Sequence, residues 1–307
     1  MFHSTPEDQS AFECAVVGAA TLHERRSYRS DGNYHRVFHL DDFDPSYPGL
    51  TVKYTDHVTL YPENLMLQHL YALACEDGDA APHVPQPVHY FHPLGGWGCM
   101  GYIVMERIEL CPVSDDELCV KAARAVQWLR TKHLPRGVLF GSLGESSAHH
   151  AVFQNSKAPL RPMFRNVALA EKYLNRAVFR ARREWNQLTD VSLADDDVVL
   201  TQSDMNAGNF GVDPNGRAGL PLTLANFTLL RTTAFATAVS KHVFNADERA
   251  ALLASPSIKS LAEARRFLSR TFDDSLGLDE DGNFREGRRR AAAESPGVTL
   301  EKLDVRS

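Results

Sequence analysis

Residues 198–200 of the 307-residue chain form an apolar run that ends abruptly in a polar loop. The loop carries Asp204 and, five residues later, Asn209, and the chain then returns to a short apolar segment and a turn at 214–216. This order predicts a carboxylate and a carboxamide on a short loop between two strands. One interpretation is an ordinary polar hairpin loop. The other is a site in which the carboxylate faces a hydroxyl and the amide oxygen holds a divalent cation.

Composition limits the class of protein. A hydrophobic content of 43% is enough to bury a large core, in one large domain or in two coupled ones. The net charge of -6 argues against a general surface for nucleic acid or anionic membranes. Five cysteines, with no CxxC or Cys/His spacing, favour reduced thiols and argue against a structural zinc site. Because no apolar run reaches membrane-spanning length, we expect a soluble cytoplasmic protein.

The N-terminal region predicts a helix and then a hairpin. Helical periodicity over residues 11–22 indicates a lead-in helix within residues 1–27. Residues 28–40 combine a turn signal at 31–33 with an alternating strand pattern, which predicts a hairpin. This hairpin is either an ordinary one or a lid over a phosphate.

A lysine and a glutamate follow in a strand and a helix. Lys53 stands in a short predicted strand, 50–54, and Glu63 follows Pro62 at the predicted start of a helix. Lys53 either extends its ammonium to water or points it at nucleotide phosphates. Glu63 either pairs with Lys53 or is a solvated first-turn acid that the helix dipole favours.

Two more strands, over 88–91 and 101–108, complete the first half of the chain. The second of them leads into a hinge at 105–109, where backbone groups of Met105 and Glu106 would meet a purine edge. Beyond residue 112 the pattern becomes helical, so we place a domain boundary near residue 110.

This order of elements resembles the aminoglycoside phosphotransferase and choline kinase branch of the protein-kinase-like fold. The catalytic loop of that family reads His-Gly-Asp-Leu-His-Pro-Gly-Asn, followed by a short strand and an Asp. Here the same frame reads Gln-Ser-Asp-Met-Asn-Ala-Gly-Asn over residues 202–209, and the later aspartate is Asp213. Segments at 141–144, 149–153 and 173–175 are similar to fungal members, and the resemblance covers residues 28–240.

The resemblance implies an α+β, bilobal protein-kinase-like fold. A small antiparallel-sheet N-lobe would span residues 28–110, and a larger, mainly helical C-lobe would span 111–307 and contain the catalytic loop 200–213. It also implies ATP and Mg²⁺ as cofactors. In such a site Lys53, held by Glu63, contacts the α- and β-phosphates, while Met105 and Glu106 border the purine.

The resemblance further implies that Asp204 orients the acceptor hydroxyl and accepts its proton, and that Asn209 binds Mg²⁺. The sequence departs from the family at Asn226, which replaces a metal-binding Asp and offers the metal an oxygen without charge. Gln202 and Ser203 depart from the family loop as well.

Three functions therefore stay open. The first is a weakened ATP-dependent phosphotransferase that acts on a small-molecule hydroxyl. The second is a catalytically inactive pseudokinase that acts through a protein partner. The third is a kinase-fold cleft repurposed for a metal-free small-molecule reaction.

Overall fold

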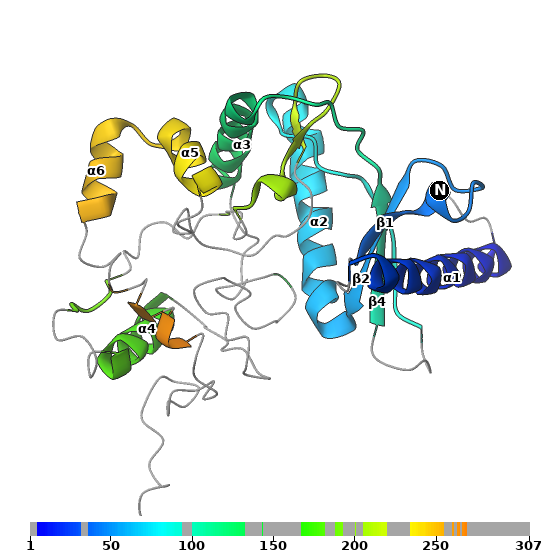
Figure 1. The fold of residues 1–307 in the computed structure, drawn as a ribbon, viewed down its shortest axis with the longest axis horizontal. Coiled ribbons are helices and arrows are strands. Elements are labelled where there is room, and N and C mark those ends of the chain that lie inside the picture. The colour runs from blue at the N-terminus through cyan, green and yellow to red at the C-terminus, as the bar shows by residue number, and fades with distance from the viewer. Residues whose placement is uncertain are drawn as a thin grey trace, which may run out of the picture.

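A computed structural model gives the fold (Figure 1). It describes residues 5–31, 36–93, 100–132, 143, 167–181, 188–192, 200, 205–219, 234–254, 260, 263–264 and 266–268. The strands of the first half lie at one end of the molecule in Figure 1, and helices α3, α5 and α6 lie at the other.

The strands of the first half of the chain form one four-stranded antiparallel sheet. Its strands lie in the order β1 (Val37–His39), β2 (Leu50–Asp56), β4 (Met100–Glu106), β3 (Pro87–Phe91). Because side chains alternate along a strand, Val52 and Tyr54 point to one face of β2, and Lys53 points to the other. The predicted strand containing Lys53 is therefore confirmed, and it extends two residues further.

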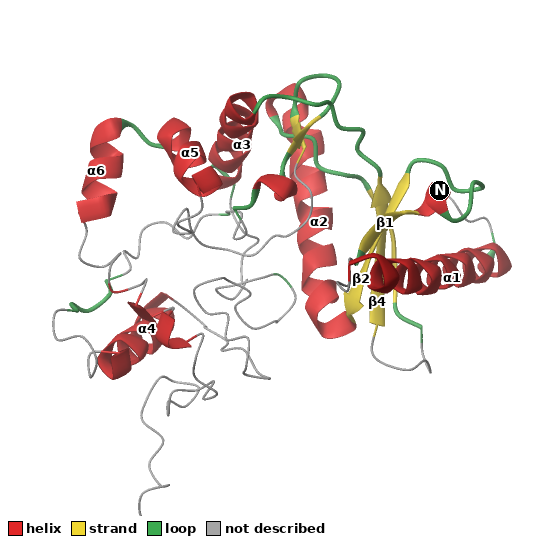
Figure 2. Ribbon diagram, in the orientation of Figure 1, coloured by secondary structure: helices red, strands yellow, loops and turns green. Residues whose placement is uncertain are grey.

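Helix α1 (Pro6–Asp31) covers the face of the sheet that carries Val52 and Tyr54 (Figure 2). Its buried side chains, Phe12, Val16, Ala19 and Ala20, recur at helical spacing. They pack against Tyr54, Tyr102 and the aliphatic residues of that face. The expected hairpin arm beginning at Tyr28 is wrong, because residues 28–31 continue α1. The apolar stripe anchors a long helix, and a glycine at position 32 is as typical of a helix end as of a hairpin turn.

Helix α2 (His57–Asp77) covers the opposite face, with Leu60, Leu67 and Leu70 fully buried. It follows β2 directly, because the Asp56 side chain accepts a hydrogen bond from the Val58 N–H at 3.0 Å and caps the helix. The predicted start at Pro62 is therefore wrong. Pro62 lies inside the helix, and Glu63 lies beyond its first turn.

The second half of the described chain is mainly helical. Helix α3 (Asp115–Arg130) begins at its N-cap Ser114, which accepts from the Glu117 N–H at 3.2 Å, and packs against α5 (Ala234–Val243). Helix α4 (Val167–Ala181) buries its apolar residues in a separate cluster, and α6 (Ala246–Ala254) follows α5. One core joins the halves, since residues of α2, β4, α3 and the segment around Phe210 belong to a single buried cluster.

Short elements connect these parts. The 3₁₀ turns η1 (Leu40–Asp42) and η2 (Gly78–Ala80) follow β1 and α2, and η3 (Ala207–Asn209) precedes a small hairpin. That hairpin pairs β5 (Gly211–Val212) with β6 (Ala218–Gly219), and Gly216 in its turn has a φ of 73°. The short strand and turn predicted after Asn209 are thus confirmed.

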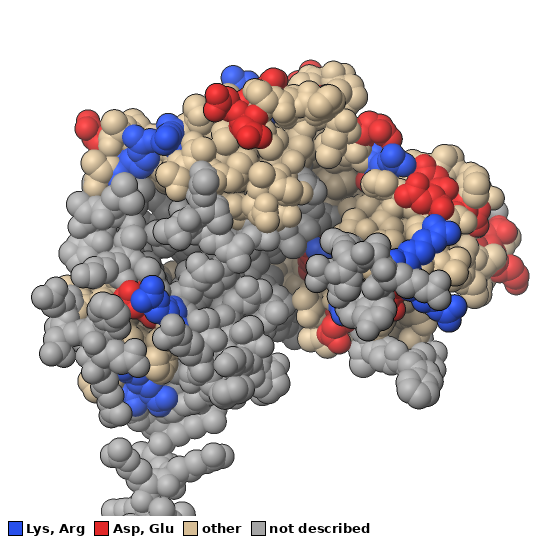
Figure 3. Space-filling model, viewed as in Figure 1, with Lys and Arg blue, Asp and Glu red and all other residues tan. Residues whose placement is uncertain are grey.

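The fold class is α+β and bilobal, with a small antiparallel sheet in the first lobe and helices dominating the second, as the sequence predicted. On the face shown in Figure 3, acidic and basic side chains are interspersed over the described parts. None of the described helices is long and apolar enough to cross a membrane.

Candidate active site

Lys53 and Glu63 form an ion pair on the inner face of the sheet, which is the face that α2 covers. The strand-to-helix connection at Asp56 is immediate, so the start of α2 lies over the end of β2 and brings the two side chains together. The Lys53 ammonium donates to Glu63 Oε1 in a short contact, and the two side chains are 13% and 11% exposed. The alternative of a solvated first-turn acid at Glu63 is therefore wrong.

Burial and the ion pair have opposite effects on the pKa of Glu63. Burial raises this pKa above its usual value of 4.5, while the attraction to Lys53 and the hydrogen bond from Lys53 lower it. A carboxyl whose pKa is raised on folding favours the protonated form, so its contribution to stability falls as pH rises through the folded pKa. Lys53 is the group that makes an ionised Glu63 tolerable at neutral pH.

The strand residues around Lys53 present a mixed surface. Ile103 lies directly opposite Lys53 and Met105 lies opposite Thr51, so these side chains share the inner face. On β1, Val37 lies opposite Lys53 and is 48% exposed. An apolar, accessible side chain beside a buried ammonium is suited to a ligand with a flat apolar part and an anionic part.

The hinge residues are firmly held. Met105 is buried, and the Glu106 N–H donates to the Gln86 carbonyl at 2.9 Å. The next N–H, of Arg107, donates to the Gly49 carbonyl at 2.8 Å. These two N–H groups therefore already have backbone acceptors.

Asn209 is the last residue of η3. Asn206 caps this turn through a 3.2 Å bond from the Gly208 N–H to its side-chain oxygen, and buried Met205 and Phe210 anchor the loop at both ends. Asn209 itself is half-buried. The other two predicted groups, Asp204 and Asn226, lie outside the described residues.

The hinge segment packs directly on the hairpin that follows Asn209. The Cys111 N–H donates to the Val212 carbonyl at 2.8 Å. A Cβ at Gly211 would lie 2.4 Å from a Leu110 methyl carbon, so glycine lets the two segments approach this closely. The hairpin that follows Asn209 is thereby held against the segment after β4.

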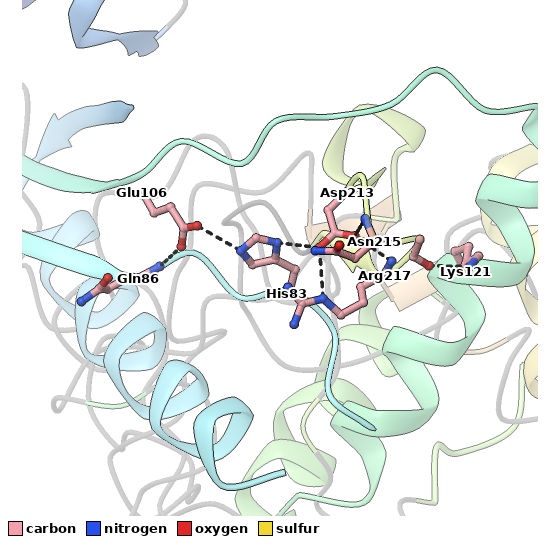
Figure 4. Close-up of polar contacts among 8 residues, drawn as sticks. His83, Gln86, Glu106, Lys121, Asp213, Asn215 and Arg217 are labelled. Carbon is pink, nitrogen blue, oxygen red and sulfur yellow. Dashed lines mark hydrogen bonds and ion pairs between the residues drawn. The ribbon is translucent and has the colours of Figure 1, made fainter. Parts of the chain in front are cut away.

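A polar network reinforces this junction (Figure 4). His83 lies between two carboxylates, with Nδ1 at 2.9 Å from Asp213 Oδ2 and Nε2 at 3.2 Å from Glu106 Oε1. Asp213 also accepts from the N–H groups of Asn215 and Arg217 and from the Arg217 guanidinium. No motif in the sequence singles out His83. Its signal would have been a histidine in a proline-flanked loop between the helix and the third strand.

Asp213 should make stability depend on pH. Burial disfavours its ionised form, but hydrogen bonds from Arg217 and His83 outweigh burial and hold its pKa below the usual 3.8. A carboxyl with a lowered folded pKa contributes stability above its unfolded pKa, and the contribution is lost as pH falls through the folded pKa. We therefore expect Asp213→Asn to cost about 1–3 kcal/mol near neutral pH.

The stability difference between wild type and Asp213→Asn should shrink below about pH 4, as the wild-type carboxyl gains its proton. Urea unfolding of both proteins near neutral pH and at about pH 3 measures it. A difference that stays constant over this range would contradict the assigned ionisation of Asp213.

The described residues do not form a metal site by themselves. No three or more His, Cys, Asp or Glu side chains within the described ranges lie close enough together to hold a metal ion. The proposed ligand Asn209 offers a neutral amide oxygen, and Mg²⁺ prefers charged oxygens. The donor set therefore fits Mg²⁺ only when phosphate oxygens of a nucleotide supply the charge.

No family model and no curated protein matches the chain. Among solved structures, it is similar to a thermostable mutant of aminoglycoside phosphotransferase APH(4)-Ia in ternary complex with AMP-PNP and hygromycin B. The identity is 11%, the TM-score is 0.46, and the match covers 81% of this chain and 89% of that one. The crystal structure of aminoglycoside-3'-phosphotransferase of type VIII matches at 16% identity and a TM-score of 0.36, over 71% of this chain and 83% of that one.

The sheet and α2 belong to the first lobe, and the β5–β6 hairpin lies in the second, where it meets the segment after β4. The structure brings Lys53 and Glu63 together and places Met105 on the same face of the sheet. Phe210, the residue after Asn209, belongs to the same buried cluster as Met105.

Proposed function

We propose that the chain is a phosphotransferase that moves the γ-phosphoryl group of ATP to a hydroxyl of a small molecule. The observation that carries this proposal is the buried Lys53–Glu63 ion pair on the inner face of the sheet. Burying a lysine and a glutamate costs free energy that an apolar pair would not. A site that must position an ammonium for phosphate oxygens accounts for that cost.

Each proposed group has a distinct role. Lys53 contacts the α- and β-phosphates and Glu63 fixes its position, while the purine lies beside Met105 and Glu106. Asp204 orients the acceptor hydroxyl and takes its proton as the new bond to phosphorus forms and the bond to ADP breaks. Asn209 and Asn226 would hold Mg²⁺, which neutralises phosphate charge when bound.

Asn226 makes this a weakened enzyme. A carboxylate at this position would add charge to the metal site, whereas an amide adds only a lone pair. Loss of a factor of about 100 in rate corresponds to about 2.7 kcal/mol of transition-state stabilisation, which is within the range of one metal ligand.

A second candidate is a pseudokinase that binds a protein partner. The sequence departures at Gln202, Ser203 and Asn226 favour it. The buried Lys53–Glu63 pair favours the enzyme, because a protein-binding surface needs no positioned ammonium inside the sheet. A metal-free reaction that keeps Asp204 as an acid or base is the remaining alternative.

The direct test is transfer of labelled phosphate from ATP to a panel of hydroxylated small molecules, with hygromycin B among them. We expect a labelled product with at least one acceptor, and about 100-fold less with Asp204→Asn, because the base is lost. If wild type and Asp204→Asn give the same rate, the measured transfer does not come from this site.

A further inference from the structure

His83 links three segments of the chain at the junction of the lobes. It lies on the connection between η2 and β3, and its N–H donates to the Ala218 carbonyl of β6 at 2.8 Å. Its ring contacts Glu106, the last residue of β4, and Asp213, the residue after β5. One side chain therefore joins the sheet of the first lobe to the hairpin of the second.

Both nitrogens of the His83 ring contact carboxylates. Nδ1 faces Asp213 and Nε2 faces Glu106, and ionised carboxylates only accept hydrogen bonds. Charge-assisted hydrogen bonds of this kind are the stronger ones, and Asp213 is only 1% exposed.

The carboxylates of Glu106 and Asp213 are also held by groups other than His83. Glu106 Oε2 accepts from the Gln86 N–H at 3.0 Å, which ties its side chain to the strand connection. Asp213 accepts from the Arg217 N–H at 2.8 Å and from the Arg217 Nε at 3.0 Å. Figure 4 shows the resulting chain from Gln86 through Glu106, His83 and Asp213 to Arg217.

This chain connects the two halves of the proposed site. Glu106 ends the strand whose residue Ile103 lies opposite Lys53, and Asp213 ends the strand that Asn209 and Phe210 lead into. We propose that His83 is a positioning residue that fixes the Asn209 loop relative to Lys53. The proposal rests on the proposed function for its effect on ATP, but its structural part is independent of any ligand.

Hydrogen exchange tests the structural part. In His83→Leu, amides of residues 211–219 should exchange about 10-fold faster or more, because the hairpin loses its link to the hinge. Amides of α1 should keep their wild-type rates. The matched control is His89→Leu, which breaks another histidine–carboxylate contact, Nε2 to Glu13 Oε1 at 2.9 Å, at similar burial but between β3 and α1.

ATP titrations test the functional part. Mg²⁺ should tighten ATP binding to wild type, and in His83→Leu this enhancement should be about 10-fold smaller, because Asn209 is displaced. The affinity for ATP without Mg²⁺ should change less than about 3-fold. His89→Leu should leave both values unchanged. His83→Gln, which keeps one donor toward Asp213, should fall between wild type and His83→Leu, and it serves as the test variant if the leucine variant does not fold.

The outcomes separate the two claims. If wild type binds no ATP, the proposed function fails, and hydrogen exchange still decides whether His83 holds the hairpin. If residues 211–219 exchange at wild-type rates in a folded His83 variant, the positioning role is overturned, whatever ATP does.

Discussion

Lys53→Met is expected to lower the free energy of unfolding by about 3–5 kcal/mol and to weaken ATP binding by about 10-fold or more. The stability loss follows from burial, because Glu63 would keep a charge at 11% exposure with no cation beside it. Part of that loss disappears if Glu63 takes up a proton, a change that burial already favours. Chemical unfolding and calorimetric titration of ATP measure the two effects separately.

A second substitution separates stability from function. Adding Glu63→Gln to Lys53→Met removes the buried charge, so most of the lost stability should return, since replacing both partners of a buried pair is often neutral. ATP binding should stay weak, because the ammonium is still absent. Recovery of both properties in the double variant would show that Lys53 does not contact the nucleotide.

Lys132→Met is the matched control for Lys53→Met. Lys132 also pairs with a carboxylate, Asp77, but at the ends of α2 and α3, away from the inner face of the sheet. We expect a smaller loss of stability and unchanged ATP binding. Equal loss of ATP binding in both variants would indicate a general effect of destabilisation.

Asn226→Asp is expected to raise the rate of phosphoryl transfer about 100-fold, equivalent to about 2.7 kcal/mol of transition-state stabilisation. The carboxylate would supply the charged metal ligand that the amide lacks. Steady-state rates at saturating ATP, measured across a range of Mg²⁺ concentrations, should show the faster transfer. The rate should also saturate at a lower Mg²⁺ concentration.

Asn206→Asp is the control for an added charge near Asn209. Asn206 is exposed and caps η3, and an aspartate can cap this turn equally well. It should leave the rate nearly unchanged. If Asn226→Asp has no effect or lowers activity, the protein is not a weakened kinase, and a metal-free reaction or a pseudokinase role is favoured.

Local sequence patterns predicted much of the fold. The short strand predicted around Lys53 is β2, and the turn predicted at 214–216 lies in the hairpin after Asn209. The helical pattern predicted beyond residue 112 is confirmed by α3, which spans Asp115–Arg130. Each of these elements follows from a local sequence pattern, so no contact between distant parts of the chain was needed to predict it.

The errors occurred where two local signals competed. Pro62 is typical of a first helical turn, but Asp56 caps the helix earlier, because the helix packs on the sheet along its full apolar stripe. The turn signal after α1 likewise matched both a hairpin and a helix end. In both places tertiary packing decided between the signals, and the sequence pattern alone could not.

The site was only partly predictable for a related reason. Lys53 and Glu63 lie ten residues apart, so their pairing was one of two foreseeable outcomes. His83 and Asp213 lie 130 residues apart, and no periodicity relates them. Their contact depends on the hinge and hairpin meeting, which is a property of the folded chain.

Titration of ATP into wild-type protein, with and without Mg²⁺, tests the central claim most directly. Followed by calorimetry or by the unfolding midpoint, binding to the folded state must raise stability, by about 2.7 kcal/mol at a 100-fold excess over the dissociation constant. We expect ATP to bind, and to bind more tightly with Mg²⁺ present. Absence of binding at millimolar ATP would contradict the phosphotransferase proposal.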